Sequence, residues 1–142
     1  MASETLSKMT FSIVKSADLE IEAVMRVYET SGLAERRPLS EPGRLQRMLD
    51  GSNLVAAAYD SGVLIGIARS ISDFSYATYL SDIAVDAAYQ RRGIGKELIR
   101  VTAEAAPQAK IVLLSAPAAV EYYPHIGFTQ HNSAWTLPAQ QS

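Results

Sequence analysis

Residues 79–98 read YLSDIAVDAAYQRRGIGKEL, and the rest of the chain is organised around this stretch. An apolar run that ends at Val85 leads into a basic turn with two glycines, Gln90 to Gly95, and a helical pattern follows. The first N–H groups of a helix have no intrahelical partner and lie at the positive end of its dipole. We therefore expect a strand, a turn and a helix start that together hold a phosphate group.

Two common nucleotide-binding motifs do not fit this turn. A dinucleotide fingerprint would need a third glycine where Leu98 stands, and a nucleotide P-loop would need Ser or Thr after Lys96. Taken alone, the turn is equally compatible with an ordinary glycine-rich helix start whose basic side chains are solvated. The sequence on either side of the turn is needed to distinguish between these two interpretations.

The other elements are predicted from the spacing of apolar residues and from glycine and proline positions. Alternating or fully apolar runs predict strands, and apolar residues three or four apart predict helices. The predicted order is a strand at 11–15, a helix from Asp18 to Gly32, a short helix from Ser40 to Gly51, strands at 54–60, 63–71 and 77–85, a helix from Ile94 to Pro107, a strand at 111–114, a short helix at 118–123, and one bent strand or two short ones at 128–137.

This order, β-α-α-β-β-β-α-β-α-β, predicts an α/β (α+β) fold with a mixed sheet and helices on both faces. Ser61-Gly62 between two β-rich runs is a hairpin signal, and the strand–helix–strand unit across 77–114 should be parallel and right-handed. The 142 residues are 48% hydrophobic, which suits one domain over 1–142. Residues 1–9 and 138–142 are expected to be a loose leader and tail.

Composition argues against several classes of function. With 13 Lys and Arg against 15 Asp and Glu, a net charge of −2 predicts no nucleic-acid partner and no membrane surface. The chain has no cysteine and only two histidines, so neither a disulfide framework nor a metal site is expected. No apolar run is long enough to span a bilayer, and we expect a cytoplasmic protein.

Two motifs resemble those of the GCN5-related N-acetyltransferase (GNAT) superfamily. The first is the strand and turn Ile83-Ala-Val-Asp-Ala-Ala-Tyr-Gln-Arg-Arg-Gly-Ile-Gly95, which matches the family's Gln/Arg-x-x-Gly-x-Gly/Ala turn in full. The second is Ala119-Val-Glu-Tyr-Tyr-Pro-His-Ile-Gly-Phe128, which departs from Ala-x-x-Phe-Tyr-x-x-x-Gly-Phe only at Tyr122. The resemblance covers roughly residues 11 to 131 and implies a sheet of six to seven strands flanked by about four helices.

The resemblance also implies a cosubstrate and a set of site residues. The pyrophosphate of acetyl-CoA would lie against the turn, and the pantetheine arm would pair with the strand before the turn. The implied cofactor-binding residues are Ile83, Ala84, Val85, Gln90, Arg91, Arg92, Gly93, Ile94, Gly95 and Lys96. Tyr123 occupies the family's general-acid position, and Asp82 is a candidate general base.

The expected activity is direct transfer of an acetyl group to a primary amine of a small molecule. Acidic residues in two loops, Glu35, Glu41 and Asp73, would suit a cationic amine. Two alternatives stay open: a non-catalytic module that binds acyl-CoA, and an enzyme that acetylates a protein N-terminus or lysine. Few residues follow Gly127, so a second subunit in a homodimer is one way to complete the acceptor side.

Overall fold

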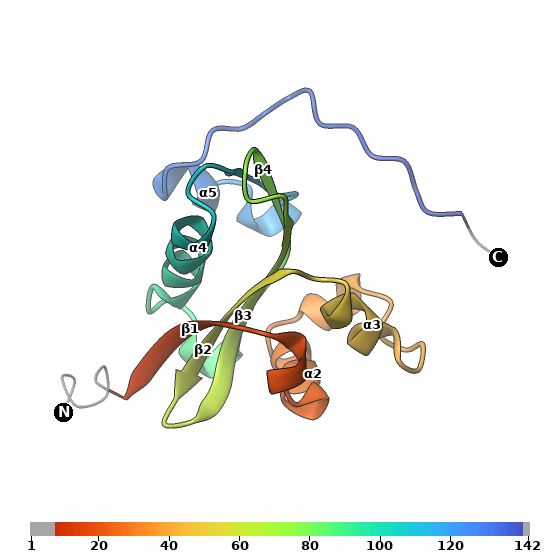
Figure 1. Ribbon diagram of the computed structural model, residues 1–142, viewed down its shortest axis with the longest axis vertical. Coiled ribbons are helices and arrows are strands. Elements are labelled where there is room, and N and C mark those ends of the chain that lie inside the picture. Colours follow the sequence, from red (N-terminus) through yellow and green to blue (C-terminus); the bar gives the residue numbers. More distant parts are fainter. Residues whose placement is uncertain (1–7, 141–142) are drawn as a thin grey trace.

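A computed structural model describes residues 8–140, and these form one mixed sheet with helices on both faces (Figure 1). The five strands lie in the order β1-β2-β3-β4-β5, and only β4 and β5 are parallel. Their bounds are β1 Met9–Val14, β2 Leu54–Asp60, β3 Val63–Ser72, β4 Ala77–Val85 and β5 Lys110–Val112. The predicted α/β (α+β) class and the parallel β4–β5 crossover are confirmed.

Four α-helices cover the sheet, as expected, together with short 3-10 turns. The helices are α2 Ile21–Thr30, α3 Arg44–Asp50, α4 Ile94–Ala105 and α5 Tyr122–His125, and the turns are η1 Ser16–Asp18, η2 Leu33–Arg36, η3 Ala87–Tyr89 and η4 Pro117–Ala119. Helices α2 and α3 pack on one face of the sheet, and α4 packs on the other. Alternate residues of β2, β3 and β4 supply the two halves of the core, since successive side chains of a strand point to opposite faces.

The β2–β3 hairpin forms where Ser61-Gly62 predicts it. Ser61 has a φ of 51° and Gly62 a φ of 84°, the left-handed pair that a two-residue turn between twisted strands requires. The hairpin joins β2 and β3, and β4 pairs antiparallel with β3, so these three strands form the centre of the sheet.

The expected six to seven strands are not found: the described residues contain five. The segment 128–137, predicted as one or two strands, has no regular secondary structure, and β5 is only three residues long. A segment with alternating apolar and polar residues forms a strand only if the edge of another strand pairs with it. Residues 129–140 are all exposed in this structure and have no such partner among the described residues. Figure 1 shows this segment leaving α5 and running away from the sheet.

Three helix boundaries differ from prediction for local reasons. Asp18 lies in η1, and α2 begins only after Glu20. Helix α3 begins after Gly43, whose φ of 76° ends the preceding turn. The helix predicted at 118–123 is split into η4 and α5, and Pro124 lies inside α5 instead of limiting it, because a proline in the first helical turn needs no N–H partner.

The expected loose leader, residues 1–9, lies mostly outside the described residues, although Met9 begins β1. Within residues 8–140, no helix has the length and apolar character needed to cross a membrane.

Candidate functional site

The turn before α4 exposes backbone at the start of a twelve-residue helix. Arg91 and Gly93 both have positive φ, 65° and 79°, so the chain reverses sharply into the helix. A Cβ added at Gly93 would meet no atom within 4 Å, so the turn has open space on this side. The first N–H groups of α4 have no intrahelical partner. The turn therefore has the geometry of an anion cradle.

A cavity of about 460 Å³ lies beside this turn, and Gly93, Lys96 and Arg100 contribute to its wall. The guanidinium of Arg100 is already ion-paired with Glu97 and Glu104 on the same helix. Lys96 also lines this cavity, and it has no ion pair with another described residue. Arg91 and Arg92 are exposed nearby.

The end of β4 next to the turn has no strand partner on its outer side. Pairing with β5 stops at Tyr79, so within the described residues 80–85 pair only with β3 and have no strand on their outer side. The side chains of Ile83 and Val85 face α4, and a Cβ added at Gly95 would lie 3.9 Å and 4.0 Å from them. Gln90 Nε2 donates a hydrogen bond to the Val85 carbonyl at 3.0 Å, which ties the turn back to the strand.

The structure thus brings most of the predicted cofactor-binding residues to one place. The apolar side chains before the turn, the glycines within it and Ile94 meet at the first turn of α4. Ala84 differs, because its side chain is buried on the opposite face of the sheet with α2 and α3.

Two adjacent tyrosines of α5 point to different surroundings. Tyr122 Oη lies 3.9 Å from the Cβ position of Gly95, beside Ile83 and Val85. Tyr123 lines a groove along β5 and packs edge-on against Phe128, with ring centroids 5.4 Å apart. Burial, and to a smaller extent Tyr122, raises the pKa of Tyr123 above its ordinary 10.0, so its phenol is protonated at neutral pH.

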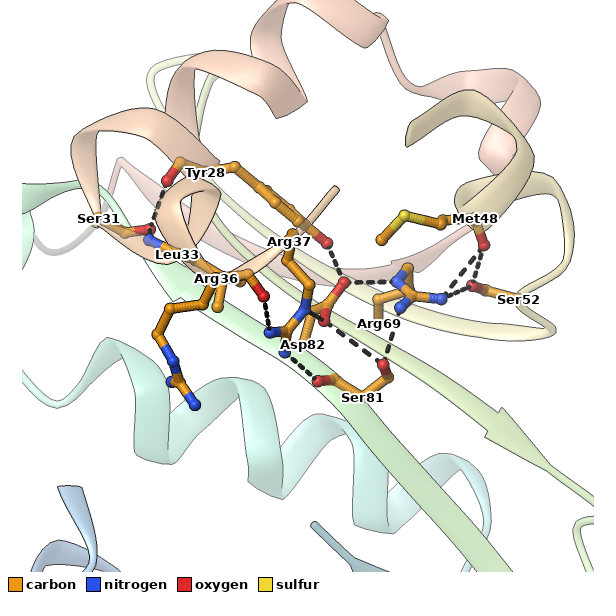
Figure 2. Close-up of polar contacts among 10 residues, drawn as sticks. All are labelled: Tyr28, Ser31, Leu33, Arg36, Arg37, Met48, Ser52, Arg69, Ser81 and Asp82. Atoms are coloured by element: carbon orange, nitrogen blue, oxygen red, sulfur yellow. Dashed lines mark hydrogen bonds and ion pairs between the residues drawn. The ribbon is translucent and has the colours of Figure 1, made fainter. Parts of the chain in front are cut away.

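Asp82 is the centre of a buried polar cluster on the other face of the sheet (Figure 2). Its Oδ2 accepts hydrogen bonds from Tyr28 Oη at 2.6 Å and from Arg69 Nε at 2.7 Å. Its Oδ1 accepts from Arg37 Nε at 2.6 Å, and Arg37 also donates to the Ser81 carbonyl at 2.9 Å. The cluster joins α2, the segment after η2, β3 and β4.

These contacts bear on the predicted role of Asp82 as a general base. Burial alone raises its pKa, but the hydrogen bonds from Arg69 and Tyr28 outweigh this, and the pKa lies below the ordinary 3.8. Both carboxylate oxygens are engaged, and the residue is 1% exposed. This environment suits a structural anion better than a proton acceptor, so the base role stays a prediction without geometric support.

Two of the three acidic loop residues, Asp73 and Glu41, are engaged within the fold, whereas Glu35 is exposed. Asp73 Oδ1 accepts three backbone N–H groups, from Ser75, Tyr76 and Ala77, and Glu41 is ion-paired with two arginines of α3. The hydrogen bonds lower the pKa of both carboxyl groups. A cationic acceptor therefore gains little from either.

Three residues of these contacts are not predicted from the sequence: Arg37, Arg69 and Tyr122. A charged residue within the apolar run of β3 is a signal that could have identified Arg69 as a buried partner. No local pattern marks Arg37, whose partner Asp82 is 45 residues away. In the described part of the chain, no three acidic or histidine side chains come together in a way that could hold a metal ion.

Comparison with known proteins gives a match to one family over most of the chain. Residues 24–136 match the Acetyltransferase (GNAT) domain. The probable acetyltransferase TAP2 of Glycine max is 32% identical over 120 residues, covering 72% of this chain and 47% of that protein. The histone acetyltransferase TAP1 of Glycine max is 29% identical over 138 residues, covering 87% of this chain and 57% of that protein. The chain thus spans about half the length of these two relatives.

Solved structures show the same fold. A GNAT family acetyltransferase from Streptococcus pneumoniae TIGR4 superposes with a TM-score of 0.75 at 20% identity, covering 94% of this chain and 99% of that one. An aminoglycoside acetyltransferase from an uncultured soil metagenomic sample superposes with a TM-score of 0.73 at 20% identity, covering 96% and 98%. Because the domain match covers most of the sequence and the folds agree, the chain belongs to the GNAT acetyltransferase family.

Proposed function

We propose that the protein is an acetyl-CoA-dependent N-acetyltransferase that acts on a primary amine of a small molecule by direct attack within a ternary complex. The observation that carries this proposal is the meeting of three features at the first turn of α4. These are an open glycine turn, an end of β4 with no strand on its outer side, and the hydroxyl of Tyr122, the neighbour of Tyr123.

The residues present fit acetyl-CoA. Open backbone N–H groups from Gly93 onward suit the pyrophosphate, and the exposed side chains of Arg91, Arg92 and Lys96 add positive charge. The outer edge of β4 near Ile83 and Val85 suits the amide groups of pantetheine, as in strand addition. Acetyl-CoA supplies the thioester carbonyl that the amine attacks.

In the transfer, a C–N bond forms as the C–S bond breaks, and the departing thiolate takes a proton from a tyrosine. Tyr123 is the proposed donor, because it holds the family's acid position and its raised pKa keeps it protonated. Tyr122 is the second candidate, because its hydroxyl lies near Gly95, at the first turn of α4. The proton lost by the amine passes to water in this scheme, since Asp82 is buried and fully engaged.

The two tyrosines can be separated by one pair of substitutions. Tyr123→Phe should lower kcat by about a hundredfold, the lower end of the range for general acid catalysis, and leave acetyl-CoA affinity unchanged. Tyr122→Phe is the matched control. The reverse pattern would move the acid role to Tyr122, and unchanged kcat in both variants would refute a tyrosine acid.

The nature of the acceptor rests on relatives that point in different directions. One structural neighbour is an aminoglycoside acetyltransferase solved with sisomicin, which supports a small amine. TAP1 is named a histone acetyltransferase, which supports a protein acceptor. We favour the small amine because a long basic protein tail needs an extended negative surface, whereas the net charge is only −2 and Glu41 and Asp73 are already engaged within the fold.

A screen for CoA release with acetyl-CoA as donor tests these alternatives directly. Turnover with small amines and not with histone-tail peptides would support the proposal, and the opposite result would identify a protein acceptor. Tight CoA binding with no turnover on any acceptor would favour the non-catalytic module. The cytoplasmic location stays a prediction from composition.

A further inference from the structure

The regular pairing of β4 with β3 is interrupted at Ser81. Its neighbours Leu80 and Asp82 pair with consecutive residues of β3, so Ser81 is an extra residue, a β-bulge. Pairing with β5 has ended before this point. Ser81 therefore has no residue opposite it on either neighbouring strand of the described chain. A bulge bends its strand and re-aims the residues beside it, so the way its polar groups are held matters for the strand beyond.

Two arginines hold the polar groups of this bulge (Figure 2). Arg37 Nη2 donates a hydrogen bond to the Ser81 carbonyl at 2.9 Å, and Arg69 Nη2 donates to the Ser81 hydroxyl at 2.8 Å. Arg69 belongs to the neighbouring strand β3, but Arg37 comes from the connection between α2 and α3, residues 31–43. Among the described residues, Arg37 is the one that hydrogen-bonds this connection to the sheet.

Arg37 is not needed to balance the buried charge of Asp82. The other carboxylate oxygen already accepts hydrogen bonds from Arg69 and Tyr28, and the Arg69 side chain is 8% exposed against 23% for Arg37. One buried arginine is enough to pair with one carboxylate. The second arginine therefore adds something besides charge balance, and its distinctive contact is the one with the Ser81 carbonyl.

The local chain holds Arg37 ready for this contact. A proline follows it, which disfavours helical backbone, and the φ of −138° and ψ of 149° at Arg37 are extended. Leu39 N–H donates to the Arg37 carbonyl at 2.9 Å, and Arg37 Nη1 donates to the Arg36 carbonyl at 2.8 Å. The guanidinium is thus preorganised by its own segment, which lowers the entropy lost in fixing the bulge.

We propose that Arg37 is a positioning residue for the donor: it fixes the bulge through the Ser81 carbonyl, and the bulge sets the open edge of β4 that receives the pantetheine arm. This inference rests on the proposed function. The open edge near Ile83 and Val85 follows directly after the bulge. Strand addition depends on the direction of each N–H and C=O group along an edge, so a bulge that relaxes would misalign them. The phosphate turn is held by α4 and would keep its geometry.

Calorimetry with two ligands separates these two parts of the donor site. Arg37→Gln should lower the affinity for acetyl-CoA by about tenfold, the value of one hydrogen bond to a charged group. Its affinity for 3′-phospho-ADP, the part of CoA without the pantetheine arm, should stay within about twofold of wild type. Arg36→Gln is the matched control, because this exposed side chain points away from Asp82 in Figure 2, and both affinities should be unchanged. An equal loss for both ligands in Arg37→Gln, or no loss for either, would overturn the proposal.

Arg37→Lys tests geometry against charge and provides a second variant if Arg37→Gln does not fold. A lysine keeps the charge beside Asp82, but its ammonium lacks the planar fork that reaches the carboxylate and the Ser81 carbonyl together. We expect the affinity for acetyl-CoA to fall about as far as in Arg37→Gln. Wild-type affinity in Arg37→Lys would show that charge alone is enough and would refute the positioning role.

Amide hydrogen exchange at saturating acetyl-CoA gives a readout that needs neither turnover nor 3′-phospho-ADP. In the wild type, the ligand should slow exchange in residues 81–86 and in residues 94–97 at the start of α4. In Arg37→Lys, the protection of 81–86 should be lost while that of 94–97 remains, and equal protection of both segments would contradict the proposal. If the wild type binds no acetyl-CoA, the proposed function and this inference both fail. If the wild type binds it and the Arg37 variants behave like the wild type, only the role of Arg37 fails.

Discussion

Removing the buried carboxylate of Asp82 should destabilise the fold strongly. In Asp82→Ala, Arg69 keeps its charge in a site where its side chain is 8% exposed, and Tyr28 loses the acceptor of its hydroxyl. Arg37 is 23% exposed, so water can replace part of what it loses. Breaking a buried ion pair from one side costs about 3–5 kcal/mol, and we expect a loss in this range.

The free energy of unfolding is measured by urea denaturation followed by circular dichroism, with an unchanged m-value as the sign that only stability has changed. The matched control is Glu41→Ala, which also removes a carboxylate bound by two arginines but at a site where the side chain is 51% exposed. The control should show no measurable change.

A second variant checks the electrostatic reason for the loss. Asp82→Leu combined with Arg69→Met should be more stable than Asp82→Leu alone, because it removes the unpaired buried charge together with its partner. A loss below about 1 kcal/mol in Asp82→Ala, the range of exposed ion pairs, would refute the buried cluster.

Three further predictions concern Asp82, Gly93 and Gly66. The pKa of Asp82 is lowered on folding, so the stability that its carboxylate adds is complete above a pH of about 3.8, its ordinary pKa, and is lost as the pH falls through the lower pKa of the folded state. In this pH range the unfolding midpoint should fall less steeply with pH in Asp82→Asn than in the wild type. Equal slopes in the two proteins would contradict this. Gly93→Val should lower acetyl-CoA affinity by about tenfold or more in a calorimetric titration, whereas Gly62→Val, at an equally left-handed and open position, should leave affinity intact. Gly66→Ala should lower the free energy of unfolding by about 1–3 kcal/mol, because the added Cβ would lie 3.2 Å from Leu98 Cδ1. An unchanged free energy in urea unfolding would contradict this and show that α4 can shift.

Much of the site could be predicted because its parts are close together in sequence. The strand, turn and helix start across 83–96 form one continuous segment, and glycine positions and helix capping depend on near neighbours. The hairpin at Ser61-Gly62 was predictable for the same reason. The roles of Tyr122 and Tyr123 were harder to separate, because which adjacent ring faces the turn depends on how α5 lies against α4 and β5.

The sequence by itself determined the order of elements up to α5, the parallel crossover and the glycine turn, since these depend on local periodicity and turn chemistry. Only the tertiary structure decided the environment of Asp82, whose partners Tyr28, Arg37 and Arg69 come from three other parts of the chain. It also decided the state of residues 129–140, because an alternating sequence becomes a strand only when another edge pairs with it. Burial and pairing of this kind are set by distant segments, and no local pattern encodes them.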